Sequence, residues 1–305
     1  MTQPLFWQPA QGSAQIWRTL LGLVLIAIIF AAVAFAIFLG GAVLMNEDPA
    51  RLLDGDTPGA ASLFFAPFLG FHVALLIVLP LLHKRRYASL FGPGSRLNLR
   101  HFRYALLVTA GMALVYALSM VVEQRVLPDD LRPDIVLITP PGRWLTLLVP
   151  IMVLIFIQTL AEELVFRGYL LQQLRARFRS IWIWAVLPSF LFGALHFDPL
   201  TYGVNAYFYV LNTTVAGVLA CLITIRTGNL GAAAGLHFAN NMLVMIMGVA
   251  GELGGFTLLA MTVNPMSGYM TWSILSQTGL SLVIFALWWR WMNRQHAIAN
   301  APGGD

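Results

Sequence analysis

Residues 147–170, LLVPIMVLIFIQTLAEELVFRGYL, run from an apolar stretch into two adjacent glutamates and an arginine. The part up to Leu160 carries no charge, and a membrane-spanning helix needs about 20 mostly apolar residues. A charged side chain at the centre of such a helix costs about 2.5–3.5 kcal/mol on insertion scales. The pair Glu162 and Glu163 therefore indicates that this span does more than anchor the chain.

The composition is that of a membrane protein. Hydrophobic residues make up 59% of the 305 residues and charged residues 10%, and the mean hydropathy is +0.77. Soluble domains carry about 25% charged residues, so we predict an all-α polytopic membrane protein. The formal net charge of +5 does not predict nucleic-acid binding, because the basic residues gather in loops that would face the anionic lipid bilayer. The single cysteine, Cys221, excludes a disulfide framework and a cysteine-based metal site.

About eight transmembrane helices are expected, because eight segments are long and apolar enough to cross a bilayer. They are residues 17–45, 62–82, 104–122, 144–166, 181–197, 204–225, 229–250 and 271–291. With Arg167 set aside as intramembrane, 13 of the 18 Lys and Arg residues fall on one side of these segments and 4 on the other. Since cytoplasmic loops carry the excess of Lys and Arg, we expect both termini in the cytoplasm.

The charged part of the opening stretch divides into two roles. Glu163 and Arg167 are four residues apart, so on a helix they share a face and can pair. Glu162 is rotated by about 100° from Glu163, and it points to a neighbouring face that this arginine does not neutralise. A buried ion pair that locks two helices explains Glu163 and Arg167 but leaves Glu162 unexplained. Ionisable groups inside a membrane are candidates for function by default.

Two later spans carry polar side chains of their own. FLFGALHF (residues 190–197) places His196 four residues after Phe192, and GLHFANNM (residues 235–242) places His237 and Asn241 on one helical face. A lone histidine in a span is more often a hydrogen-bonded packing residue than a catalyst. A glutamate, two histidines and an asparagine on three spans instead favour water activation, in which a carboxylate or imidazole takes a proton and an N–H stabilises the oxyanion.

These three motifs, in this order and on separate spans, resemble the CPBP family of intramembrane proteases. That family includes the type II CAAX prenyl endopeptidases, the Abi proteins of bacteriocin immunity and lysostaphin-resistance-like proteins. The resemblance implies a protease core at residues 144–250 with four spans and an intramembrane catalytic cavity. Residues 1–143 would be an N-terminal region with three spans and a basic cytoplasmic loop. Residues 251–305 would hold an outer loop, the last span and a cytoplasmic tail.

The resemblance also implies roles for individual residues. Glu162 and His196 would activate the attacking water, Glu163 and Arg167 would support them, and His237 with Asn241 would hold the water or the oxyanion. Zn²⁺ is the alternative, because Glu162, His196 and His237 offer three ligands of a catalytic zinc site. We expect no cofactor, since the His-Glu-x-x-His motif of many zinc proteases is missing.

The expected function is hydrolysis of a peptide bond in a membrane-associated peptide or protein, in the inner membrane of a bacterium. The substrate is either a prenylated C-terminal peptide or a bacterial peptide or membrane protein, and the resemblance to the bacterial branch favours the second. A transporter would also place ionisable groups in the membrane, but the inverted repeats typical of many transporters are not visible. A non-catalytic scaffold or immunity protein would have lost a motif residue, and all of them are present.

The depth of the two catalytic candidates conflicts with the predicted span ends. At about 1.5 Å per residue, Glu162 lies about 27 Å along the helix from Trp144, which places Glu162 near the cytoplasmic face. His196 lies about 22 Å from Ile181, which is on that same face. Either the fourth helix is tilted and begins after Trp144, or residues 176–187 protrude into the cytoplasm.

Overall fold

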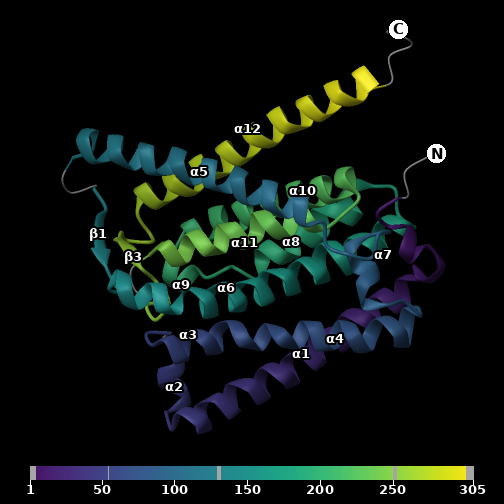
Figure 1. Ribbon diagram of the computed structural model, residues 1–305, viewed down its shortest axis with the longest axis horizontal. Helices are drawn as coiled ribbons and strands as arrows, with labels where there is room; N and C mark the ends of the chain where they lie inside the picture. The colour runs from purple at the N-terminus through teal and green to yellow at the C-terminus, as the bar shows by residue number, and fades with distance from the viewer. Residues whose placement is uncertain (1–4, 54, 129–131, 250–252, 300–305) are drawn as a thin grey trace. The chain divides into compact units, whose positions relative to one another are not determined.

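The computed structural model describes residues 5–53, 55–128, 132–249 and 253–299, with side chains described as far as Arg294 (Figure 1). The chain forms two compact units. The first comprises Met1–Pro188 and Ala220–Val263, and the second comprises Ser189–Leu219 and Asn264–Asp305. The predicted regional boundaries at residues 143 and 250 divide the chain in sequence order and stay predictions.

The first unit contains most of the helices and all the described strands. Its elements are η1 (Gln8–Ser13), α1 (Ile16–Met45), α2 (Pro49–Leu52), α3 (Pro58–Phe65), η2 (Ala66–Phe68), α4 (Leu69–Val78), η3 (Leu79–His83), η4 (Tyr87–Phe91), α5 (Leu99–Val126), β1 (Asp134–Leu137), α6 (Pro141–Glu163), η6 (Leu164–Leu170), α7 (Leu171–Arg177), η7 (Trp182–Val186), α11 (Gly231–Ile246), β2 (Met247–Val249) and β3 (Leu259–Thr262). The second unit contains α9 (Pro199–Tyr202) and α12 (Gly268–Ala299), while α8 (Leu187–Ala194) and α10 (Asn205–Thr227) cross the boundary.

Six helical stretches of the described residues are long and apolar enough to cross a membrane. They are Ile16–Met45, Pro58–His83, Leu99–Val126, Pro141–Arg177, Asn205–Thr227 and Gly268–Arg294. The protein is therefore an all-α polytopic membrane protein, as the composition predicts. The other two predicted spans, 181–197 and 229–250, correspond to the shorter helices Trp182–Ala194 and α11. The 16 residues of α11 cover only about 24 Å, less than the roughly 30 Å of the hydrocarbon core.

The fourth long stretch runs without a break through α6, η6 and α7, from Pro141 to Arg177. It contains Pro150, and its hydrogen bonding changes from α to π directly after Glu163. Its 37 residues would cover about 55 Å, so at least one end extends beyond the hydrocarbon. The helix continues past residue 166, the predicted end of the span, and Glu162 lies about 22 Å from the helix end at Arg177. The helix begins at Pro141, so the alternative in which it begins after Trp144 is wrong.

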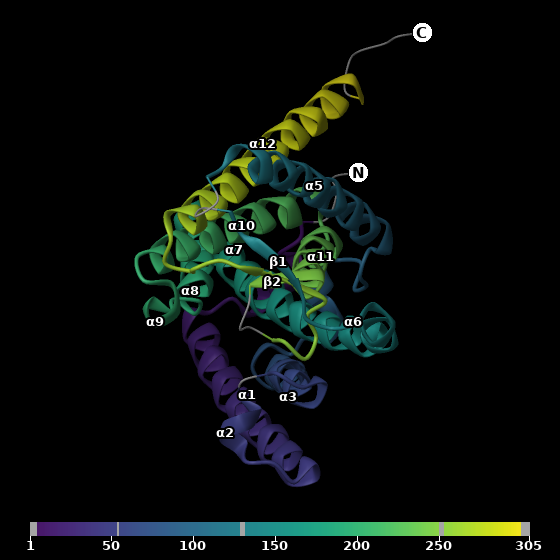
Figure 2. The ribbon, with the colours of Figure 1, turned by 90° about the vertical axis from the view of Figure 1, so that its left-hand side faces the viewer.

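In the first unit the long helices form a row in the order α5, α11, α6, α4, α1. Contacts join each neighbouring pair, and both ribbon views show α11 between α5 and α6 (Figures 1 and 2). The helix α11 approaches α5 closely, because a Cβ atom on Gly235 would lie 2.5 Å from the Phe102 carbonyl oxygen. Small residues at helix interfaces permit this close packing in membranes. The row places α6 and α11, which carry most of the predicted site, in its interior.

Two hydrophobic clusters lie on either side of the charged part of the α6–α7 stretch. One cluster contains Trp144, Ile151 and Ile155 and packs against α11 and Phe256. The other contains apolar residues of the same stretch, from Leu164 to Leu174, together with buried residues of α4. The polar residues between Gln158 and Glu163 therefore lie where the first apolar cluster ends and the second begins.

A small sheet of three strands was not predicted. Strand β3 pairs antiparallel with β1, with Ile135 opposite Met261, and parallel with β2. The Trp144 indole nitrogen donates to the Phe256 carbonyl oxygen at 2.9 Å, which ties the start of α6 to the segment before β3. Strands of three or four residues leave too short an alternating pattern to be read from sequence.

Candidate active site

The α6–η6 stretch carries the charged half of the site. Glu162, Glu163 and Arg167 expose only 8%, 1% and 3% of their surface. The Arg167 Nη1 atom lies 3.0 Å from Glu163 Oε1, so the pair expected from the four-residue spacing is present. Charged side chains are almost never this buried unless they are paired.

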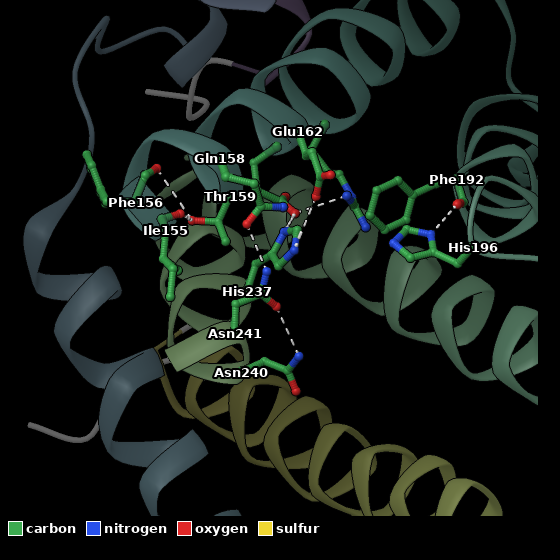
Figure 3. A network of polar contacts seen from close by, with 12 residues as sticks. Ile155, Phe156, Gln158, Thr159, Glu162, Phe192, His196, His237, Asn240 and Asn241 are labelled. Carbon is green, nitrogen blue, oxygen red and sulfur yellow. Dashed lines mark hydrogen bonds and ion pairs between the residues drawn. The ribbon is translucent and has the colours of Figure 1, made fainter. Parts of the chain in front are cut away.

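His237 on α11 contacts both glutamates. Its Nδ1 atom lies 2.9 Å from Glu163 Oε1, and its Nε2 atom lies 3.3 Å from Glu162 Oε2 (Figure 3). The imidazole therefore contacts the carboxylates of two adjacent residues. That Arg167 does not neutralise Glu162 stays a prediction.

Two basic side chains, Arg167 and His237, thus lie against the two buried carboxylates. Nδ1 of His237 is within hydrogen-bond distance of Glu163, and Nε2 is within ion-pair distance of Glu162. Buried charged side chains are tolerated where they are paired. This pairing is the physical reason that a span tolerates two adjacent glutamates.

Asn241 lies one helical turn after His237 and pairs with a residue that the sequence analysis missed. Its Nδ2 atom donates to Gln158 Oε1 at 2.9 Å, and its Oδ1 atom accepts from Asn240 Nδ2 at 3.2 Å. Gln158 is four residues before Glu162 on the same helix, so it lies on the same face. That spacing was the available signal. An amide inside an apolar span is uncommon enough to have been singled out.

His196 belongs to the second unit, where it follows α8. Its Nδ1 atom lies 2.9 Å from the Phe192 carbonyl oxygen, which only accepts, so Nδ1 carries the proton. The four-residue spacing of Phe192 and His196 thus lets a backbone carbonyl group hold the imidazole ring through Nδ1. The predicted partnership of His196 with Glu162 would join residues of different units and stays a prediction.

Over the described parts of the chain, no group of three or more His, Cys, Asp or Glu side chains could hold a metal ion. The alternative zinc ligands Glu162, His196 and His237 belong to both units, and this set stays a prediction.

Parts of the chain are similar to known proteins. A family model described as "Type II CAAX prenyl endopeptidase Rce1-like" matches residues 144–243. Residues 144–243 are therefore similar to the Rce1-like family. The Rce1-like region nearly coincides with the predicted core at 144–250, and it contains all six predicted site residues together with Gln158.

One curated relative extends the similarity beyond the Rce1-like region. The chain is 27% identical over 250 residues to "Uncharacterized protein YyaK" of Bacillus subtilis (strain 168), covering 78% of this chain and 79% of the relative. No solved structure matches the chain significantly. Because the Bacillus protein is itself described as uncharacterized, the similarity to it carries no information on activity. The Rce1-like match supports a protease at the level of the family.

Proposed function

We propose that this protein is an intramembrane endopeptidase that hydrolyses a peptide bond in a membrane-associated protein or peptide. The observation that carries the proposal is the buried cluster in which His237 bridges Glu162 and Glu163 while Arg167 holds Glu163. A purely structural ion pair needs only Glu163 and Arg167. The additional carboxylate and imidazole lie 3.3 Å apart, and such a pair can accept and return a proton during hydrolysis.

In the proposed reaction Glu162, aided by His196, takes a proton from water as the water oxygen attacks the peptide carbonyl carbon. The carbonyl oxygen becomes an oxyanion, which an N–H of Asn241 stabilises. The proton on Glu162 then passes to the leaving nitrogen, and the C–N bond breaks to give a carboxylic acid and an amine. Transfer of the acid proton to the amine leaves a carboxylate and an ammonium group. Glu163 and Arg167 hold His237, which faces Glu162, in one orientation.

The proposed substrate is a bacterial peptide or membrane protein, with a prenylated C-terminal peptide as the alternative. The test compares the termini of membrane-associated peptides and proteins in cells that carry the wild-type gene and in cells that carry Glu162→Ala. We expect new termini, from the products of cleavage, in the wild-type cells only. Identical sets of termini would contradict the proposal, and cleaved ends near a prenylated cysteine would support the alternative substrate.

We also propose that the reaction needs no metal. The sequence has a complete glutamate, histidine and asparagine set but no His-Glu-x-x-His motif. The purified enzyme is expected to keep its cleavage rate after exhaustive chelation and to contain less than one equivalent of zinc. A chelated enzyme that is inactive and that zinc alone restores would instead assign Glu162, His196 and His237 as ligands.

The chain is an integral membrane protein, and we propose that it lies in a bacterial inner membrane with both termini in the cytoplasm. The 13-to-4 distribution of basic residues supports this orientation. Reporter domains fused after Asp56 and after Pro133 should be outside, and one fused after Gly94 should be in the cytoplasm. A cytoplasmic signal from the fusion after Pro133 would contradict the proposed orientation.

A further inference from the structure

The contact between Gln158 and Asn241 joins the two helices that carry the proposed catalytic groups. Gln158 lies on α6 one turn before Glu162, and Asn241 lies on α11 one turn after His237. The two helices are therefore joined by two successive polar contacts, the glutamates with His237 and Gln158 with Asn241 (Figure 3). Gln158 exposes only 6% of its surface, so its amide is withdrawn from both water and lipid.

Two neighbouring side chains contact the amide of Asn241. Its nitrogen donates to Gln158 Oε1, and its oxygen accepts from Asn240 Nδ2. The first contact uses one of the two N–H bonds of the amide nitrogen, and the second bond remains for another acceptor. Without Gln158 the amide could rotate by 180° and present its oxygen, which would repel the oxyanion of the proposed reaction.

We infer that Gln158 is a positioning residue that holds the Asn241 amide with its nitrogen toward the developing oxyanion. The inference rests on the proposed function and adds a residue to it. Gln158 acts through Asn241 and does not need to touch the substrate. Donors that stabilise an oxyanion contribute most when they are oriented before the reaction begins.

A role limited to joining α6 and α11 makes a different prediction. Interhelical side-chain hydrogen bonds in membranes contribute little to stability on average. Loss of such a bond would lower the melting midpoint or leave the enzyme unchanged. Loss of a positioning contact lowers kcat at an unchanged KM and an unchanged melting midpoint, because the interaction matters only in the transition state.

The experiment uses the full-length enzyme and one cleavable peptide substrate. Gln158→Met and Gln158→Leu both remove the amide, and their different shapes separate its loss from a packing defect. Each variant should lower kcat by about tenfold or more, since removal of a whole oxyanion donor costs about 10²–10³-fold. KM should change by less than about twofold. Thr159→Val is the matched control, because the Thr159 hydroxyl donates to the Ile155 carbonyl oxygen of its own helix.

A double variant tests whether Gln158 acts through Asn241. Since a positioning residue has nothing to position once the amide is gone, Gln158→Met combined with Asn241→Ala should cleave no more slowly than Asn241→Ala alone. If the two substitutions instead lower kcat by the product of their separate effects, the inference is overturned. It is also overturned if both Gln158 variants keep the wild-type kcat while Asn241→Ala is impaired. Wild-type cleavage by Glu162→Gln would instead remove the proposed function, and the inference would fall with it.

Discussion

Glu162→Gln is expected to abolish peptide cleavage while the protein stays folded and inserted in the membrane. The substitution keeps the shape of the side chain and removes the proton acceptor. Its amide could still donate to or accept from the imidazole of His237, which lies 3.3 Å from Glu162 Oε2, so the contact between α6 and α11 should persist. Removal of a general base typically lowers the rate by about 10²–10⁴-fold.

The measurement is the cleavage rate of one peptide by purified wild-type and variant enzyme, beside a melting curve in detergent. Glu123→Gln is the matched control, because it makes the same change on α5, where no catalytic role is proposed. The control should cleave at the wild-type rate. Wild-type cleavage by Glu162→Gln would show that the glutamates are structural, and the protease proposal would fail.

Arg167→Ala is expected to lower stability as well as activity. Glu163 exposes 1% of its surface, and Arg167 is its guanidinium partner at 3.0 Å. Removal of Arg167 leaves the Glu163 carboxylate with the imidazole of His237 only. Breaking a buried ion pair by removing one partner costs about 3–5 kcal/mol. The melting midpoint in detergent should therefore fall, and cleavage should fall with it because His237 loses its fixed neighbour.

Two further variants separate charge from packing. Glu163→Gln removes the negative charge and leaves the buried Arg167 guanidinium without that carboxylate, so it should show part of the activity loss of Glu162→Gln and part of the stability loss of Arg167→Ala. Arg103→Ala serves as the control, since Arg103 is an exposed arginine on α5. An Arg167→Ala protein that melts at the wild-type temperature would show that the pair does not stabilise the fold.

The sequence by itself determined the features that depend on composition or on contacts within one helix. Its high hydropathy and its 10% of charged residues determined the membrane class, because soluble domains carry about 25%. The four-residue spacing of Glu163 and Arg167 determined their pairing, because residues four apart on a helix are neighbours whatever surrounds the helix. The three ordered motifs predicted a protease core at residues 144–250, and the Rce1-like match lies at residues 144–243.

The tertiary structure decided the features that depend on how α6 meets α11. Which face of α11 contacts Glu162 follows from the rotation of both helices, and that rotation is set by packing such as the close approach of Gly235 to Phe102 on α5. Spacing within either helix carries no information on this rotation. The bridge from His237 to both glutamates and the contact of Gln158 with Asn241 could therefore be seen only in three dimensions.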